Sequence, residues 1–174
     1  RKTIIKNLQI DNVNIEINAR GTTRNNSTPK GYNIGIVAGT MYNNAEIKNV
    51  IANNSSVIDN YTMTIRTNSV QIFVGGIVGT ATNSSSSSRD PGNGKRYAIE
   101  NCYSNLNVDL DMRLYYSYRY GTYYYVAGQY AVGGIIGSIM HQSVWPENCL
   151  FKGELNATNG FTGPIFGYSR GNTG

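Results

Sequence analysis

A short glycine-rich block occurs four times in this chain, and this repetition limits the possible folds more than any other feature. The copies are G-I-V-A-G at 35–39, G-G-I-V-G at 75–79, G-G-I-I-G at 133–137 and G-P-I-F-G at 163–167. A second block accompanies it, as I-K-N-L at 5–8, I-K-N-V at 47–50, I-E-N-C at 99–102 and P-E-N-C at 146–149. Such units cannot bury an apolar face alone, and they become stable by stacking on their neighbours. The sequence therefore predicts a repeat architecture.

The blocks keep their sequence while the distance between them varies. The block asparagines lie 42, 52 and 47 positions apart, and the last glycines lie 40, 58 and 30 positions apart. This pattern indicates constant strands joined by loops of different lengths. We expect one elongated domain over residues 1–174, with insertions at about 81–96 and 110–129. Because the chain begins with arginine and ends just after a glycine block, we expect it to be a segment of a longer protein.

Composition and alternation both indicate strands. Glycine accounts for 20 of the 174 residues, only 14% are charged, and the strong helix formers alanine and leucine are scarce. The first and third residues after each block asparagine fall on one face of a strand. These pairs are Leu8 and Ile10, Val50 and Ala52, Cys102 and Ser104, and Cys149 and Phe151. We expect this face to point inward in an all-β parallel β-helix (β-solenoid) of about four coils. The alternative is a two-sheet β-sandwich.

In such a stack, equivalent residues of successive coils lie about 4.8 Å apart. Glycines at fixed positions suit a tight bend or a close approach of two walls. The block asparagines are expected to form an internal ladder, in which each amide bonds the next; the alternative is a set of surface turns. The residues of this predicted structural ladder are Asn7, Asn49, Asn101, Asn148, Gly39, Gly79, Gly137 and Gly167.

The run V-G-G-I-V-G followed at a variable distance by I-E-N-C-Y-S resembles the GLUG repeat of large surface and adhesin-like proteins. The best matches are residues 74–79 with 99–104, and 132–137 with 147–151. The outer copies depart from the pattern, because Ile36 and Pro164 stand where the second glycine is expected. The resemblance implies a β-solenoid used as a stalk or display scaffold, and it carries no catalytic residue across.

The second insertion is rich in tyrosine. Gly121 and Thr122 separate two tyrosine-rich runs, which favours a β-hairpin that projects from the stack. Tyrosine and arginine are favoured at binding hot spots and at stacking surfaces. The hairpin is therefore a candidate contact surface for a glycan or a neighbouring subunit, and the alternative is that it packs on its own chain. The candidate residues are Tyr115, Tyr116, Tyr118, Arg119, Tyr120, Tyr123 and Tyr124.

Seven asparagines stand in Asn-x-Ser/Thr acceptor sites, which in a secreted eukaryotic protein would carry glycans. They are Asn25, Asn26, Asn53, Asn54, Asn60, Asn83 and Asn156. The first insertion contains five consecutive serines, at 84–88, and is expected to be a surface loop.

Cys102 and Cys149 occupy matched positions one coil apart, which predicts stacked buried thiols, with a disulfide as the alternative. Two cysteines without clustered histidines do not make a zinc site.

Nothing in the sequence indicates catalysis or a cofactor. The net charge of +5 is spread along the chain, so a nucleic-acid partner is not expected, and no apolar stretch is long enough for direct membrane insertion. The lone His141 has no evident catalytic partner. Asp109 and Asp111, beside Arg113, could form a glycosidase-like pair or a calcium site, and an exposed strand explains them equally well.

We therefore expect a non-enzymatic structural module of an extracellular filament, stalk or adhesin at the cell surface. Its expected partners are further copies of itself, stacked head to tail, or other surface proteins, with possible glycans. The alternative function is a carbohydrate-binding module that uses the tyrosine-rich hairpin. A third interpretation is a fragment of a polysaccharide-active enzyme.

Overall fold

The structure is a computed structural model, and it describes residues 3–17, 31–42, 45–59, 63–65, 71–82, 97–119, 122–126, 129–140, 144–158 and 160–169. Within these ranges every regular element is a β-strand. The described part of the chain thus contains no helix of the length and apolar character needed to cross a membrane.

The strands fall into four repeats that follow the two sequence blocks. The first repeat contains β1 (Thr3–Asp11), β2 (Asn14–Ile17), β3 (Gly31–Gly35) and β4 (Ala38–Met41). The second contains β5 (Ala45–Asp59), β6 (Met63–Ile65), β7 (Gln71–Gly75) and β8 (Val78–Ala81). The third contains β9 (Tyr97–Glu100), β10 (Tyr103–Arg119), β11 (Thr122–Val126), β12 (Gln129–Gly133) and β13 (Ile136–Ile139). The fourth contains β14 (Val144–Glu147), β15 (Leu150–Lys152), β16 (Leu155–Thr158), β17 (Phe161–Gly163) and β18 (Phe166–Ser169).

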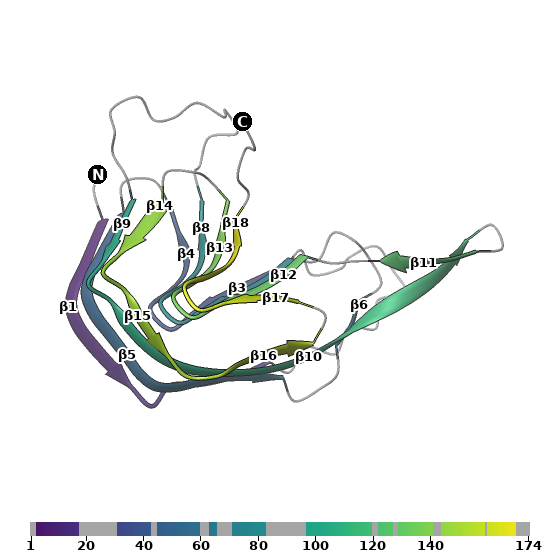
Figure 1. Cartoon of the computed structure of the whole chain (residues 1–174), viewed down its shortest axis with the longest axis horizontal. Helices are drawn as coiled ribbons and strands as arrows, with labels where there is room; N and C mark the ends of the chain where they lie inside the picture. Colours follow the sequence, from purple (N-terminus) through teal and green to yellow (C-terminus); the bar gives the residue numbers. More distant parts are fainter. Residues whose placement is uncertain are drawn as a thin grey trace, which may run out of the picture.

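These strands form three separate sheets (Figure 1). Sheet A contains β1, β2, β5, β6, β9, β10, β11, β14, β15 and β16. Sheet B has the order β17-β12-β7-β3, and sheet C has the order β18-β13-β8-β4. All pairs are parallel except the antiparallel pair β10–β11. The prediction of an all-β fold with parallel ladders is confirmed, and this pairing is not the antiparallel pairing of a β-sandwich. Three separate sheets do not in themselves confirm a continuous β-helical coil.

Strand register places equivalent residues of the repeats beside one another. In sheet A, Ile47 pairs with Ile5 on one side and Ile99 on the other. In sheet B, one row consists only of glycines, namely Gly35, Gly75, Gly133 and Gly163. The one register shift recorded in these ladders lies between β5 and β10, at Ser104 to Leu106. Equivalent positions of the sequence blocks therefore lie side by side in the sheets.

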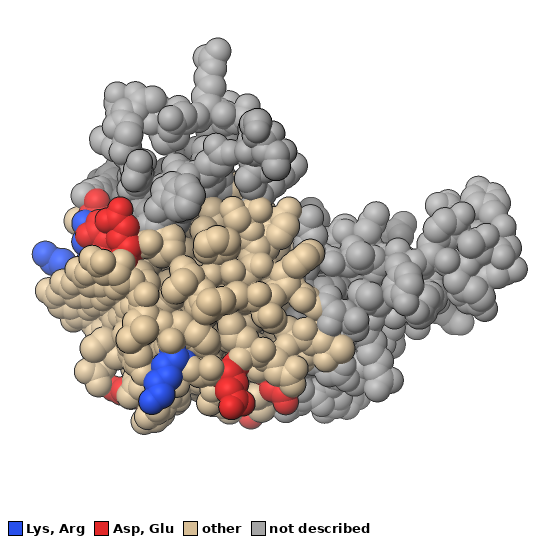
Figure 2. Space-filling view, in the orientation of Figure 1, with Lys and Arg blue, Asp and Glu red and all other residues tan. Residues whose placement is uncertain are grey.

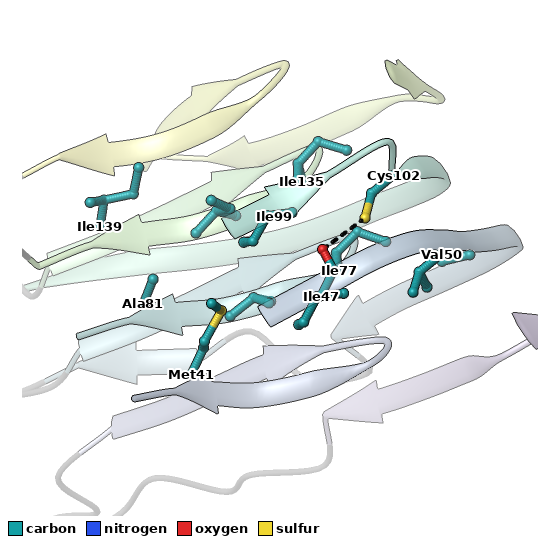
Figure 3. Packing of buried hydrophobic residues seen from close by; sticks show 12 residues of the cluster. Met41, Ile47, Val50, Ile77, Ala81, Ile99, Cys102, Ile135 and Ile139 are labelled. Carbon is teal, nitrogen blue, oxygen red and sulfur yellow. Dashed lines mark hydrogen bonds between the residues drawn. The ribbon is translucent and has the colours of Figure 1, made fainter. Parts of the chain in front are cut away.

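Two apolar clusters hold sheet A against the other sheets. The first joins the N-terminal half of β5, with β9 and the neighbouring Cys102, to Ala81 and Ile139 of sheet C (Figure 3). The second joins the C-terminal end of β5 and the N-terminal half of β10 to Ile72, Val74 and Val132 of sheet B. Burial is complete only in the middle repeats. Of the inward pairs expected from alternation, those of the second and third repeats are buried, as predicted. In the outer repeats the equivalents remain partly open, and Leu8 is 39% exposed.

The block glycines are needed where sheets B and C approach each other. A Cβ atom at Gly137 would lie 2.5 Å from the carbonyl oxygen of Gly79 and 2.6 Å from the backbone nitrogen of Val74. A Cβ atom at Gly76 would collide with the Ser104 hydroxyl. The first repeat has Ile36 at the equivalent place, where it packs against the first cluster, and Ala52 pairs with Ser104 of the next repeat. The close approach of neighbouring strands and sheets, as predicted, explains these glycines.

Described strands overlap the approximate insertion bounds at three points. Ala81 is the last residue of β8, and residues 83–96 lie outside the described part of the chain. Leu110 is fully buried in the second cluster, and β10 continues to Arg119 without a break. Gln129 begins β12 and pairs with Gln71 of sheet B. Strands therefore enter and leave the second insertion directly.

Candidate functional site

Three of the four block asparagines form a hydrogen-bonded ladder at a corner of sheet A. Asn7, Asn49, Asn101 and Asn148 have φ values of 55°, 54°, 53° and 49°, a left-handed conformation that asparagine tolerates well. The Asn49 amide donates to Asn7 Oδ1 at 3.0 Å, and the Asn101 amide donates to Asn49 Oδ1 at 3.2 Å. All four side chains are exposed, so the predicted internal position is wrong. The ladder joins surface turns, because a left-handed residue marks the corner where the chain changes direction.

A row of charged residues lies beside this ladder. Lys6, Lys48, Glu100 and Glu147 occupy equivalent register positions in the four repeats, and we name them the first charged row. The Lys48 ammonium lies 3.1 Å from Glu100 and 3.7 Å from Glu46. The hydrogen bond to Glu100 raises the pKa of Lys48. The row runs from lysine in the first two repeats to glutamate in the last two.

In a second charged row, the order of the charges from the first to the fourth repeat is reversed. It consists of Asp11, Asn53, Asn105 and Lys152, which are equivalent residues beyond the corner. The Asn53 amide donates to Asp11 Oδ1 at 3.2 Å, and the Asn105 amide donates to Asn54 Oδ1 at 3.2 Å. The acid thus lies in the first repeat and the lysine in the fourth. On the face seen in Figure 2, the described charges lie at the rim of an otherwise uncharged surface.

The two cysteines are free thiols one repeat apart, close enough for one thiol to act as hydrogen-bond donor to the other. Cys102 is buried, and Cys149 is partly exposed in the fourth repeat. Each sulfur also lies within hydrogen-bond distance of a backbone carbonyl oxygen, that of Glu100 at 3.3 Å for Cys102 and that of Ile99 at 3.4 Å for Cys149. The hydrogen bond between the thiols lowers the pKa of Cys149 to about 7 and raises that of Cys102. Cys149 is therefore the more nucleophilic thiol of the pair.

The tyrosine-rich segment forms the expected pair of antiparallel strands. Residues Tyr115–Arg119 of β10 pair with Thr122–Val126 of β11, so that Tyr116 lies opposite Tyr125 and Tyr118 opposite Tyr123. In Figure 1, this end of β10 extends away from the three sheets together with β11. Tyr124 lies opposite Ser117, and Tyr120 lies outside the described residues.

Three of the acceptor asparagines fall in the described part of the chain. Asn53 is half-buried, and Asn54 and Asn156 are exposed. The Asn53 amide nitrogen, to which a glycan would be attached, donates to Asp11, and that of Asn156 donates to Asp109 at 2.8 Å. A glycan at either residue would have to replace a bond between repeats. Asn25, Asn26, Asn60 and Asn83 lie outside the described residues.

The candidate catalytic groups are not brought together into a described site. Asp109 is exposed and bonds Asn156, while the side chains of Asp111 and Arg113, and the whole of His141, lie outside the described parts. Among the residues whose side chains are described, no group of three or more histidines, cysteines or acids could hold a metal ion.

Sequence reasoning missed the two charged rows, although their signal was present. The first row is the residue before each block asparagine, and the second is the residue four positions after it. The first row changes from positive to negative charge along the stack, and the second from negative to positive. These trends become apparent only once the repeats are known to be stacked. Comparisons with protein-family models, curated proteins and solved structures find no match to this chain.

Proposed function

We propose that this chain is a β-solenoid module of the GLUG type that serves as a structural element of an extracellular filament, stalk or adhesin. One observation carries the proposal: in each sheet, the neighbours of a residue are its equivalents in the adjacent repeats. The chain passes through sheets A, B and C in each repeat and returns to sheet A one strand further on. This order of strands supports a coiled path of the chain.

The proposed role is mechanical and requires no cofactor or catalytic residue. Backbone hydrogen bonds between repeats run along the stack, and side-chain ladders such as Asn7–Asn49–Asn101 add to them. Clusters between the sheets resist bending, because each of the two middle repeats is packed on two neighbours. The exposed acceptor residues Asn54 and Asn156 suit a glycosylated cell-surface location.

Electron microscopy of the native material tests this proposal. We expect rods or filaments in which the module contributes about 19 Å of length, from four strands at about 4.8 Å each. Native material that consists only of compact globular particles would contradict the structural role.

A second candidate function is carbohydrate binding by the hairpin, favoured by its antiparallel tyrosine pairs. A glycan array followed by titration calorimetry tests it. Saturable binding that is lost in Tyr118→Ala and Tyr123→Ala, and kept in Ser117→Ala, would support it. Equal binding by all three variants, or none by the unmodified chain, would oppose it.

A further inference from the structure

The stack has two ends, each with strand edges and apolar side chains. The first-repeat end consists of β1 to β4, and the fourth-repeat end consists of β14 to β18. Ile4 is 48% exposed at the first end, and Leu150 and Phe161 are 62% and 58% exposed at the fourth. Within the described ranges, the outer edges of these strands have no paired neighbour. Open edges of this kind accept further strands.

We infer that the fourth-repeat end of one copy docks on the first-repeat end of a second copy, with the register of the internal ladders continued across the joint. This inference rests on the proposed structural function and deepens it by naming the partner surface. The occupant is a second copy because the charges of the two ends are complementary.

In the first charged row, continued register places Glu147 beside Lys6 of the next copy. The internal precedent is the Lys48–Glu100 pair, which joins the second and third repeats of the same row at 3.1 Å. In the second charged row, the same register places Lys152 beside Asp11 of the next copy. Each row therefore carries opposite charges at its two ends, and the order of the charges in one row is the reverse of that in the other.

The other described charged residues of sheet A at the two ends also meet suitable partners. Glu154 belongs to the row of Asn107, Ser56 and Asn14, so it would face Asn14. Asn156 belongs to the row of Asp109, Ile58 and Glu16. It would therefore face Glu16, as it already faces Asp109 within the chain at 2.8 Å. Among the described residues of sheet A, continued register opposes no like charges at the joint.

This joint joins different surfaces of the two copies, so it does not close at a dimer. A heterologous contact between identical copies propagates into a fibre when its rotation does not close a ring. Two copies joined by identical ends would instead stop at a dimer, and they would lose the continued rows.

Charge reversal at the ends tests the joint on the chain 1–174. The measurement is sedimentation velocity over a range of protein concentrations, at low and high salt. We expect the unmodified chain to form a concentration-dependent series of oligomers that weakens as salt screens the rows. Lys6→Glu alone and Glu147→Lys alone should each weaken association at least tenfold, because each places like charges together.

An equimolar mixture of the two variants provides the decisive comparison. Every joint between a Lys6→Glu chain and a Glu147→Lys chain again pairs opposite charges, so the mixture should assemble as the unmodified chain does. Ile51→Lys, which adds a positive charge at an exposed position of the second repeat, away from both ends, is the control and should assemble normally. Restoration in the mixture also excludes misfolding as the cause of the loss.

Three results would overturn the joint: an unmodified chain that stays monomeric at all concentrations, assembly that stops at a dimer, or assembly that is indifferent to both reversals. The proposed structural function is judged separately, by microscopy of the native material. A monomeric recombinant chain together with native filaments would refute the joint and leave the structural role standing.

Discussion

The Asn49 side-chain amide donates a hydrogen bond of 3.0 Å to Oδ1 of Asn7, a residue 42 positions earlier in the chain. Both residues are left-handed corners of sheet A, and the same bond is repeated between Asn101 and Asn49. Asparagine thus serves two purposes: it adopts the left-handed backbone conformation of the corner, and its side chain bonds that corner to the equivalent corner of the adjacent repeat.

Substitutions of Asn49 separate these two purposes. Asn49→Gly keeps the φ of 54° without strain and removes the ladder bonds, whereas Asn49→Ala removes the bonds and also adds strain. We expect Asn49→Ala to be the less stable variant by about 1 kcal/mol, the cost of a left-handed alanine. Urea unfolding followed by circular dichroism measures the difference. Equal stabilities would show that the backbone conformation contributes nothing at this corner.

Gly137→Val tests the close approach of sheets B and C. Its Cβ atom would lie 2.6 Å from the backbone nitrogen of Val74 in sheet B and 2.5 Å from the Gly79 carbonyl oxygen in sheet C, and rigid backbone cannot move aside cheaply. We expect a loss of about 3 kcal/mol, at the upper end for overpacking. The matched control is Thr158→Val, an exposed strand position that should change stability little. A thermal melt of Gly137→Val equal to that of the unmodified chain would refute the close approach.

Ser138 is buried, and its hydroxyl has no hydrogen-bond partner among the described residues. Ser138→Ala should therefore stabilise the chain by about 1 kcal/mol, because an unsatisfied buried hydroxyl is removed. Its neighbour in sheet C, Thr80, donates to Asn33 Oδ1 at 3.0 Å, so Thr80→Val should instead destabilise. Chemical denaturation that ranks the two variants in the opposite order would contradict this assignment.

Alkylation should distinguish the two thiols. The hydrogen bond from Cys102 lowers the pKa of Cys149 to about 7, so its thiolate fraction rises as the pH increases through that value. We expect iodoacetamide to label Cys149 with a rate that is half-maximal near pH 7, and Cys102 far more slowly because it is 2% exposed. Mass spectrometry of the labelled peptides follows both rates.

The control is Cys102→Ala, which removes the donor and should move the midpoint for Cys149 upward, toward the ordinary value of a cysteine. A midpoint that is the same in both proteins would show that the thiols do not interact.

Much of the fold could be predicted from the sequence, because it depends on repetition. Copies of one block must bury the same face. Equivalent residues therefore lie beside one another, as Ile5, Ile47 and Ile99 do. Period two then places Val50 and Ala52 inside. Glycine positions were also predictable, since a repeated glycine indicates a repeated close approach.

Other features depend on context that a single repeat does not contain. Leu8 follows the same pattern as Val50 but is 39% exposed, because no described repeat covers it. A repeated asparagine does not reveal on which side of a turn it lies, and the ladder proved to be on the surface. The tyrosine-rich composition suggested an insertion from residue 110, yet Leu110 is core and β10 simply continues beyond it. The complementary rows become visible only when the two ends are compared.

Spin-label spectroscopy of strand register in the isolated chain is the most direct test of in-register stacking of the repeats. Nitroxides at Gln9 and Ile51, both exposed and paired between β1 and β5, would lie on neighbouring parallel strands with Cα atoms about 4.8 Å apart. We expect strong dipolar broadening in the doubly labelled chain, and none in a mixture of the two singly labelled chains below the association range. A doubly labelled spectrum equal to the sum of the single ones would contradict in-register stacking of the repeats.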